Sequence, residues 1–331
     1  MRCAVIGAGA WGTALGDLLA AAGHEVRIWA YEVDVVASIN QQHENTRFLN
    51  GVRLAPGLRA TNDQSAALER ASLVIYATPS THLRAITRAG AACIRPEAIL
   101  AVASKGIELG SMALMTDVVS AEVPGKAVVA LSGPSFAVEV AARQPTAVVA
   151  ASTDHSAARK VQEAMSGGTF RVYTHDDVTG VELGGSLKNV MAVATGILEG
   201  VGLGFNSRAA LITRGLAEMT RLGTSLGARA STFAGLAGIG DLVLTCTGTL
   251  SRNRTLGVEI GQGKSLEEAR AGKETVAEGV VTTASAIELA AREGVEMPIA
   301  EMVYRILFDR HPAKLAAQEL MARELRSEQD E

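Results

Sequence analysis

The sequence predicts an α/β domain with a doubly wound parallel sheet, followed by an all-helical domain. Two patterns predict this division. Short apolar runs alternate with helical segments in the first part of the chain, which is typical of a parallel sheet with helices on both faces. From residue 178 onward, long helical segments follow one another and no segment has a clear strand pattern. The length of 331 residues also suits two domains.

The first elements follow from the N-terminal residues. Residues 3–6 form a short apolar run that ends in glycine, which is typical of a buried parallel strand. Residues 13–22 are rich in Ala and Leu and predict a helix that Gly23 ends. Residues 26–29 predict the second strand. Further apolar runs predict strands at 73–77, 99–103, 127–131 and 147–150.

The second half contains four long segments with helical composition. They cover residues 181–198, 207–226, 282–292 and 299–308. The polar stretch Thr-His-Asp-Asp at 174–177 lies between the two patterns. We therefore expect a dinucleotide-binding domain at residues 1–177 and a helical substrate-binding and catalytic domain at residues 178–331.

Composition excludes several classes of function. The net charge is -4, whereas nucleic acids and anionic membranes call for a basic partner surface. No apolar run reaches the roughly 18 to 20 residues that a membrane span needs. The N-terminus lacks the features of a signal peptide. The three cysteines are scattered, which suits a reducing compartment, so we expect a cytoplasmic protein. The histidines have no metal-ligand spacing, so we assign no metal.

A glycine-rich turn follows the first predicted strand. Residues 7–12, Gly-Ala-Gly-Ala-Trp-Gly, fit the pattern G-x-G-x-x-G and open the first predicted helix. In this context Gly7 permits the tight turn, Gly9 lets the backbone approach a pyrophosphate, and Gly12 permits close packing of helix on sheet. The helix N-terminus offers N–H groups to phosphates. The turn therefore predicts a Rossmann-type nucleotide site.

The end of the second predicted strand leaves the choice between NAD and NADP open. An acidic residue that would hold the ribose 2′-hydroxyl is expected near Trp29 or Ala30, and neither is acidic. Glu32 lies slightly late in the chain for this role. Tyr31 stands where an arginine would accept a 2′-phosphate. We expect both cofactors to be used.

Several later segments carry a family resemblance. They are Ser-Lys-Gly at 104–106, Gly-Pro-Ser-Phe-Ala at 133–137, Gly-Gly-Ser-Leu-Lys-Asn at 184–189, Gly-Asp-Leu at 240–242, Thr-Cys-Thr at 245–247 and Ser-Arg-Asn-Arg at 251–254. With these motifs in order from residue 4 to about residue 310, the chain resembles the bacterial NAD(P)-dependent sn-glycerol-3-phosphate dehydrogenases.

The resemblance implies a fold and an activity. Members of this family have a Rossmann domain followed by a helical domain of the 6-phosphogluconate-dehydrogenase type. They reduce dihydroxyacetone phosphate to sn-glycerol 3-phosphate, which supplies glycerophospholipid synthesis. They are commonly dimers, so a homodimer without integral membrane association and without nucleic acid is expected.

The same resemblance assigns roles to residues. Lys188 resembles the family's general acid/base, and Lys105 and Asp241 complete the expected catalytic set. On a helix, Gly184 and Gly185 share a face with Lys188, so we expect them to leave space for substrate and nicotinamide. The expected substrate contacts are Lys105, Gly133, Ser135, Lys188, Asp241, Thr245, Ser251, Arg252 and Asn253. The expected cofactor contacts are Gly7, Gly9, Ala10, Trp11, Gly12, Tyr31, Lys105, Ala137, Arg252, Val276 and Glu278.

Ser251, Arg252 and Asn253 resemble a phosphate clamp. Arginine presents a planar fork of donors that matches a phosphate. Ser251 also suits the N-cap of the next helix, whose N-terminus favours an anion.

Two other interpretations compete with this one. The first is a different dehydrogenase with the same two domains, of the β-hydroxyacid or 6-phosphogluconate type, and the clamp segment argues against it. The second is a non-catalytic nicotinamide sensor, which the presence of Lys105, Lys188 and Asp241 disfavours. Activity on a hydroxyacid but not on dihydroxyacetone phosphate would favour the first.

Overall fold

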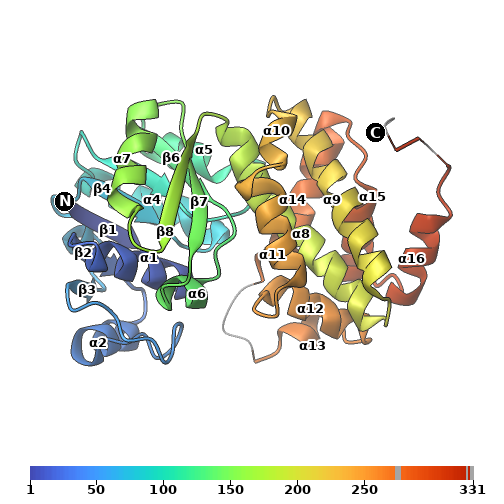
Figure 1. The fold of residues 1–331 in the computed structure, drawn as a ribbon, viewed down its shortest axis with the longest axis horizontal. Coiled ribbons are helices and arrows are strands. Elements are labelled where there is room, and N and C mark those ends of the chain that lie inside the picture. The colour runs from blue at the N-terminus through green and yellow to red at the C-terminus, as the bar shows by residue number, and fades with distance from the viewer. Residues whose placement is uncertain (273–276, 326, 329–331) are drawn as a thin grey trace. The chain divides into compact units, whose positions relative to one another are not determined.

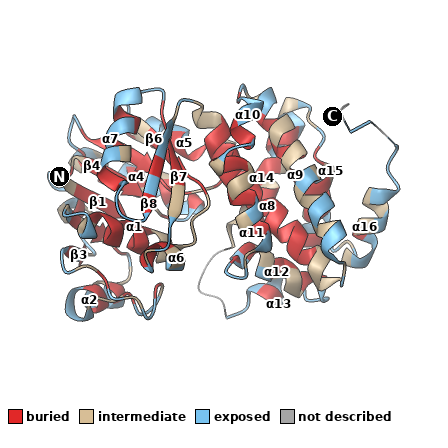
Figure 2. Ribbon diagram, viewed as in Figure 1, coloured by how far each residue is buried: buried red, intermediate tan, exposed pale blue. Residues whose placement is uncertain are grey.

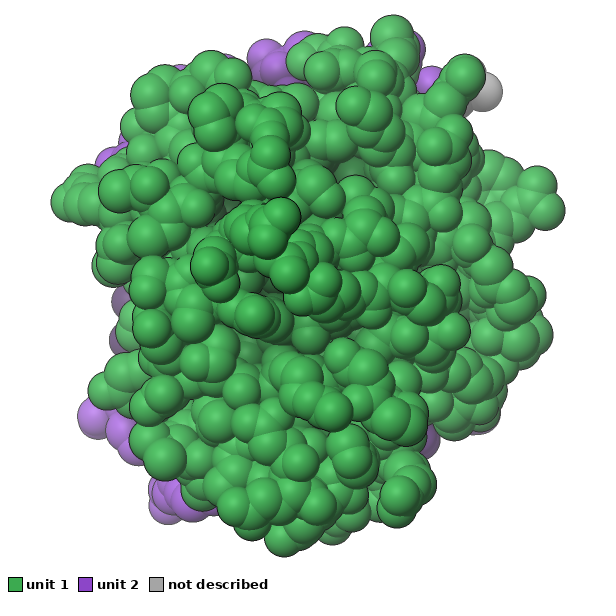
Figure 3. All heavy atoms as spheres, turned by 90° about the vertical axis from the view of Figure 1, so that its left-hand side faces the viewer, with its two compact units in different colours: residues 1–105, 115–178 green, residues 106–114, 179–331 purple. Residues whose placement is uncertain are grey.

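The computed structural model describes residues 1–272, 277–325 and 327–328. The chain divides into two compact units. Unit 1 contains Met1–Lys105 and Met115–Val178, and unit 2 contains Gly106–Leu114 and Thr179–Glu331 (Figure 3). The short segment 106–114 therefore belongs to unit 2, although it lies within the first half of the sequence.

Unit 1 is an α/β unit built on one sheet (Figure 1). Its elements are β1 (Arg2–Ile6), α1 (Ala10–Ala21), β2 (Glu25–Trp29), α2 (Val33–Gln42), β3 (Leu58–Thr61), α3 (Gln64–Leu68), β4 (Leu73–Tyr76), α4 (Ser80–Gly90), η1 (Ala91–Cys93), β5 (Ile99–Val102), α5 (Met115–Glu122), β6 (Val128–Ser132), α6 (Ala137–Ala141), β7 (Thr146–Ala151), α7 (His155–Met165) and β8 (Phe170–His175).

The eight strands lie in the order β3-β2-β1-β4-β5-β6-β7-β8. Strands β4 and β5 are buried along their whole length, which explains why they appear in the sequence as short apolar runs. Strands β3 and β8 form the two edges of the sheet and alternate between buried and exposed residues. Charged residues such as Arg59 and Arg171 interrupt their apolar character, so hydrophobic patterning in the sequence does not predict these two strands.

The predicted doubly wound parallel sheet is present, with one antiparallel pair of strands that the sequence does not predict. The pairs from β3 through to β6 are parallel, as is β7 with β8, but β6 and β7 run antiparallel. A parallel crossover needs about a dozen residues, usually as a helix that returns the chain along the sheet. The connection between β6 and β7, residues 133–145, is long enough for a crossover, but its helix α6 has only five residues and is too short to return the chain along the sheet, so the chain reverses direction.

Unit 2 is helical. Its helices are α8 (Val178–Gly200), which begins at the last residue of unit 1, α9 (Phe205–Ser225), α10 (Ala230–Phe233), the π-helical turn η2 (Leu236–Gly240), α11 (Asp241–Thr247), α12 (Arg252–Gly261), α13 (Leu266–Arg270), α14 (Glu278–Glu293), α15 (Pro298–Phe308) and α16 (Ala313–Met321). In the described part of residues 179–331 we find no β-strand, as the sequence predicts.

Helix α8 is the central helix of unit 2. Every residue from 180 to 197 is buried, and Figure 2 shows this helix as buried over most of its length. A helix that is buried on all sides has no polar face, and α8 accordingly lacks a clear amphipathic pattern. Lys188 is therefore held inside the unit rather than on its surface.

Glycines bring α12 into backbone contact with α8. A Cβ atom at Gly196 would lie 2.1 Å from the carbonyl oxygen of Arg254, and one at Gly200 would lie 2.2 Å from that of Val258. From the other side, a Cβ at Gly257 would lie 2.2 Å from the carbonyl oxygen of Val193. These two helices can approach this closely only because neither has a side chain at the crossing.

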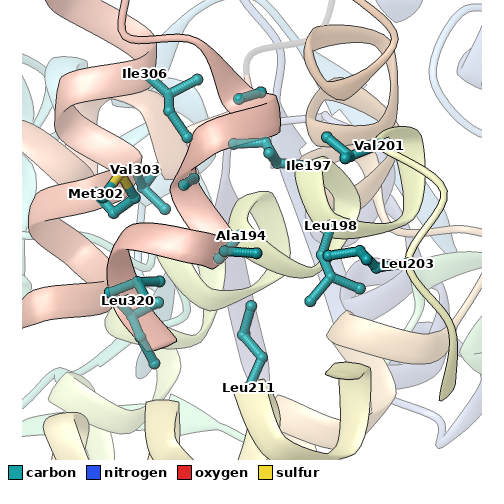
Figure 4. Close-up of a pocket in the computed structure, with 14 residues that line it drawn as sticks. Ala194, Ile197, Leu198, Val201, Leu203, Leu211, Met302, Val303, Ile306 and Leu320 are labelled. Carbon is teal, nitrogen blue, oxygen red and sulfur yellow. The ribbon is translucent and has the colours of Figure 1, made fainter. Parts of the chain in front are cut away.

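A small apolar cavity of about 60 Å³ lies between α8, α9, α15 and α16 (Figure 4). Ala194, Leu211, Val303 and Leu320 each line it from a different helix, and the other lining residues are apolar too. Such a cavity has no group that would recognise a phosphate or a hydroxyl. Among the described residues, no helix is both long and apolar enough to span a membrane.

Candidate active site

The glycine-rich turn lies between β1 and α1, as the sequence predicts. Gly7 has a φ of +113°, and a Cβ there would lie 2.7 Å from the carbonyl oxygen of Ala77. A Cβ at Gly12 would lie 1.9 Å from the carbonyl oxygen of Gly7. Both glycines are therefore required by the fold of the turn itself, whether or not a ligand binds.

At Gly9 and Trp11, in contrast, the described structure leaves space and a hydrogen-bond donor unused. A Cβ at Gly9 would have no atom within 4 Å, and its φ of -64° suits any residue. The indole Nε1 of Trp11 is buried and has no hydrogen-bond partner in the described part of the chain. Open space beside a bare backbone and an unpaired buried donor fit a phosphate-bearing ligand.

Sequence reasoning missed two further residues around this turn. Asn45 is fully buried and donates from Nδ2 to the carbonyl oxygen of Ala8 and to Oγ1 of Thr13, both at 2.8 Å. The hydroxyl of Thr78 is buried without a partner among the described residues, and its methyl group lies 3.1 Å from where a Gly7 Cβ would be. A signal for Thr78 existed, because it follows a strand at the carboxyl edge where ligands bind in such sheets.

The residues after β2 lie at the same edge of the sheet. Ala30 is buried, whereas the side chain of Tyr31 is 81% exposed. Glu32 occupies the N-cap position of α2 but makes no side-chain capping bond. Arg47 pairs with Asp34 in the first turn of α2.

Lys105, Gly133 and Ser135 lie together at the carboxyl ends of β5 and β6. The ammonium group of Lys105 lies 3.4 Å from the carbonyl oxygen of Gly133, and the hydroxyl of Ser135 donates to that oxygen at 3.0 Å. Gly133 has a φ of +136°, and a Cβ there would lie 2.9 Å from Cα of Val148. The glycine is thus fixed by backbone conformation and packing. Ala137 begins α6 directly afterwards.

Gly106, the residue after Lys105, is hydrogen-bonded to α8, the helix that carries Lys188. The N–H of Gly106 donates to Oγ of Ser186 at 2.9 Å, and this hydroxyl donates back to the Gly106 carbonyl oxygen at 3.1 Å. Ser186 lies two residues before Lys188 on α8. This pair of hydrogen bonds is one reason why the segment 106–114 belongs to unit 2.

Lys188, Asp241 and Thr245 form a buried polar cluster in unit 2. The Lys188 ammonium donates to Oδ1 of Asp241 at 2.6 Å and to Oγ1 of Thr245 at 2.8 Å. Lys188 is 8% exposed and Asp241 is fully buried. The Thr245 hydroxyl donates to the backbone oxygen of Asp241 at 2.6 Å, so it turns a lone pair toward the ammonium. A carboxylate this close favours the charged form of the lysine.

The expectation that Gly184 leaves space for substrate is wrong. A Cβ at Gly184 would lie 2.3 Å from the carbonyl oxygen of Ala237, so the backbone of η2 already occupies this space. Within η2, Gly238 has non-helical backbone angles. The glycine on α8 instead allows η2 to pack closely, and Asp241 begins α11 immediately after η2.

The cysteine next to Thr245 is a buried, protonated thiol. Cys246 is fully buried, and burial raises the pKa of its thiol to about 12. A thiol in that state is not a nucleophile at neutral pH. All three cysteines are free, as the sequence analysis expects.

The Ser-Arg-Asn-Arg segment begins α12. The hydroxyl of Ser251 caps this helix by accepting from the N–H of Arg254, which confirms the predicted cap. Arg252 is exposed. Although the residue is exposed, neighbouring atoms displace part of the water around its guanidinium, and this desolvation lowers the pKa of the group. The nearby carboxylate of Glu278 opposes this shift. An arginine stays protonated in either case, so it can bind an anion.

Asn253 connects three elements of unit 2. Its Nδ2 donates to Oδ1 of Asn189 at 2.9 Å, next to Lys188 on α8. Its Oδ1 accepts from the N–H of Gly279 at 2.9 Å, in the first turn of α14. Glu278 is the first residue of α14, whereas Val276 lies outside the described residues. The amide of Asn253 thus links α12 and α14 to α8, next to Lys188.

Comparison with known proteins gives a consistent result over both units. Residues 2–158 match the family model described as NAD-dependent glycerol-3-phosphate dehydrogenase N-terminus, and residues 177–318 match the one described as its C-terminus. The chain is 52% identical over 330 residues to a glycerol-3-phosphate dehydrogenase [NAD(P)+] of Geobacter sp. (strain M21), covering 99% of this chain and 98% of that relative.

A second relative and a solved structure point to the same family. The glycerol-3-phosphate dehydrogenase [NAD(P)+] of Trichlorobacter lovleyi is 53% identical over 333 residues, covering 99% of this chain and 100% of that relative. The crystal structure of glycerol-3-phosphate dehydrogenase from Coxiella burnetii is similar with a TM-score of 0.94 and 41% identity, over 97% of this chain and 99% of that one.

Proposed function

The chain belongs to the NAD-dependent glycerol-3-phosphate dehydrogenase family, and on that premise we propose which residues carry its reaction. It is an oxidoreductase that uses NAD or NADP and reduces dihydroxyacetone phosphate to sn-glycerol 3-phosphate, a precursor of glycerophospholipids. The interpretations as a hydroxyacid dehydrogenase or as a non-catalytic sensor are therefore set aside.

The buried cluster of Lys188, Asp241 and Thr245 is the observation that carries the mechanism. The nicotinamide cofactor, when bound, supplies a hydride to C2 of the substrate. The C2 oxygen then gains negative charge, and the Lys188 ammonium donates a proton to it, leaving a neutral amine. Asp241 stabilises the ammonium before transfer, and the Thr245 hydroxyl orients it. In the reverse direction the neutral amine of Lys188 accepts the hydroxyl proton.

The substrate phosphate is assigned to the first turn of α12. Arg252 supplies a charged fork of donors, and the uncapped N–H groups of the helix end favour an anion. Asn253 uses one N–H of its amide on Asn189, and its second N–H is assigned to the phosphate. Ser251 supports this turn through its capping bond. Lys105, Gly133 and Ser135 are proposed as further substrate contacts.

Arg252→Ala tests the phosphate assignment. We expect the KM for dihydroxyacetone phosphate to rise about a hundredfold, because hydrogen bonds to charged groups contribute about 1.5–3 kcal/mol. Steady-state oxidation of NADH measures this change. Dihydroxyacetone, which lacks the phosphate, is the control substrate, and its low turnover should not change. An unaltered KM for the phosphorylated substrate would place the phosphate elsewhere.

The cofactor is assigned to the carboxyl edge of the sheet in unit 1. Gly7, Gly9, Ala10, Trp11 and Gly12 are proposed to hold its pyrophosphate. Tyr31, Lys105 and Ala137 are proposed as further contacts from unit 1, and Arg252, Val276 and Glu278 from unit 2. The open space at Gly9 and the unpaired indole N–H of Trp11 support this assignment.

Gly9→Val separates cofactor binding from folding. No atom lies within 4 Å of the position of its Cβ, so we expect the variant to fold and unfold like the wild type. Its side chain would stand where the pyrophosphate must approach, so the Kd for NADH should rise at least about tenfold. Fluorescence titration and thermal unfolding measure the two effects. Gly12→Ala is the contrasting variant, because its Cβ would collide with the Gly7 carbonyl and should reduce stability.

The cofactor and substrate contacts are divided between the two domains. We propose that residues 1–177 supply most of the dinucleotide contacts, and that residues 178–331 supply most of the substrate contacts and the catalytic lysine. We also propose that the enzyme is a cytoplasmic homodimer. The family resemblance supports the dimer, and the three free cysteines support a reducing compartment. Size-exclusion chromatography with light scattering measures the oligomeric state.

A further inference from the structure

The two arginines of the Ser-Arg-Asn-Arg segment have different environments. Arg254 donates from Nε to Oε2 of Glu199 at 3.0 Å, and from Nη2 to Oε1 and Oε2 at 2.7 and 2.6 Å. Its side chain is only 12% exposed, whereas Arg252 is exposed. A guanidinium that is paired with a carboxylate in this bidentate way has its strongest donors committed inside the protein. Arg254 therefore has a different task from Arg252.

Glu199 lies on the same helix as the catalytic lysine. Both residues belong to α8, and eleven positions along a helix correspond to about 16 Å. Arg208, in the first turns of α9, also donates to Oε2 of Glu199 at 2.8 Å. One carboxylate near the end of α8 thus holds the starts of both α9 and α12.

The backbone of Arg254 is pressed against α8 as well. A Cβ at Gly196 would lie 2.1 Å from the carbonyl oxygen of Arg254, so the two helices touch there without intervening side chains. Such a contact sets how closely the helices approach, but it has few side-chain atoms that prevent sliding or rotation. The pairing of Arg254 with Glu199, one helical turn beyond Gly196, supplies a directional restraint.

We propose that Arg254 is a positioning residue for the substrate phosphate. Through Glu199 it fixes the first turn of α12 on α8, and it thereby sets where the guanidinium of Arg252 lies relative to Lys188. This inference rests on the phosphate role proposed for Arg252. It goes beyond that role because Arg254 acts without touching the substrate.

Arg254→Gln is the variant that tests this role. It leaves Glu199 paired with Arg208, so no carboxylate is left without a cation and the variant should fold. We expect the KM for dihydroxyacetone phosphate to rise at least about tenfold, while kcat/KM for dihydroxyacetone changes less than about twofold. Arg254→Lys retains the charge but not the fork of donors, and should recover part of the loss. Glu199→Gln should reproduce the effect from the other partner.

The double variant Arg252→Ala/Arg254→Gln shows whether Arg254 acts through Arg252. If it does, Arg254→Gln should cause no further loss once Arg252 is absent. Lys264→Gln is the matched control, because it removes an exposed ion pair to Glu259 on the same helix. This control should leave kcat and KM for both dihydroxyacetone phosphate and dihydroxyacetone unchanged.

The outcomes separate the two proposals. An unaltered KM for dihydroxyacetone phosphate in Arg254→Gln would overturn the positioning role. An equal decrease of kcat/KM for dihydroxyacetone phosphate and for dihydroxyacetone would overturn it as well. Additive losses in the double variant would overturn it too. If Arg252→Ala itself has no effect on this KM, the phosphate assignment fails first. If Arg254→Gln does not fold, Arg254→Lys and Glu199→Gln decide the matter in the same assay.

Discussion

Replacing Lys188 with alanine should lower the turnover of dihydroxyacetone phosphate by about a thousandfold. Proton donation by a positioned side chain typically contributes a factor of about 10² to 10⁴. Lys188 is the cation of a buried cluster in which a carboxylate and a hydroxyl fix its ammonium. The Kd for NADH should change much less than kcat, because the proposed pyrophosphate contacts lie in unit 1.

The single variant has a second effect that must be separated from the first. Removing Lys188 takes away the cation that forms an ion pair with the fully buried carboxylate of Asp241. Breaking a buried ion pair in this way costs about 3–5 kcal/mol of stability. Lys188→Met combined with Asp241→Asn removes both charges and should restore stability but not turnover. Kinetics, NADH titration and thermal unfolding of the wild type, Lys188→Ala and the double variant measure these effects. A Lys188→Ala enzyme with a kcat near that of the wild type would refute the acid/base role.

Gly257→Ala should destabilise unit 2 by more than about 3 kcal/mol. Helix propensity alone predicts the opposite, because alanine is favoured over glycine by about 1 kcal/mol in a helix. Here the added Cβ would lie 2.2 Å from the carbonyl oxygen of Val193 and 2.9 Å from Cα of Gly196. Helices α8 and α12 would have to separate, and the contacts along their crossing would be lost. Overpacking of this kind typically costs about 1–3 kcal/mol, and a backbone collision lies above that range.

Denaturant unfolding measures this change, with Gly204→Ala as the matched control. Gly204 also lies in unit 2, at the N-cap of α9, but a Cβ there would have no atom within 4 Å. Replacing Gly204 with alanine should lower the free energy of unfolding by about 1 kcal/mol or less. If Gly257→Ala proves as stable as Gly204→Ala, the close crossing of α8 and α12 is not required. Because α12 begins with the proposed phosphate-binding turn, partly folded Gly257→Ala protein should also bind dihydroxyacetone phosphate weakly.

The unpredicted parts of unit 1 have local physical causes. Strands β3 and β8 are edge strands whose exposed positions carry charged residues, so they lack the apolar runs of the central strands. The antiparallel pairing of β6 with β7 depends on the shortness of helix α6 between them. Neither feature is visible as hydrophobic periodicity, although both follow from the topology of the sheet.

The contacts of the candidate site were predictable only in part. The motifs identified Lys188, Asp241 and Arg252, and the cap formed by Ser251 was also foreseen. The roles of Gly184 and Asn45 were not foreseen, because each depends on a segment that is remote in sequence: η2 for Gly184 and the glycine-rich turn for Asn45. The sequence also gave no sign that the two arginines of one motif have different partners.

The sequence by itself determined the two-domain division, the central strands, the long helices, the glycine-rich turn and the family. These depend on local rules, since a helix or a turn is set by residues a few positions apart. Only the tertiary structure decided which polar groups meet. Lys188 and Asp241 are 53 residues apart, and Asn189 and Asn253 are 64 apart. Their contacts depend on how closely α11 and α12 approach α8. That distance is set by glycines of α8, because Gly184 packs against the backbone of η2, which leads into α11, and Gly196 packs against the backbone of α12.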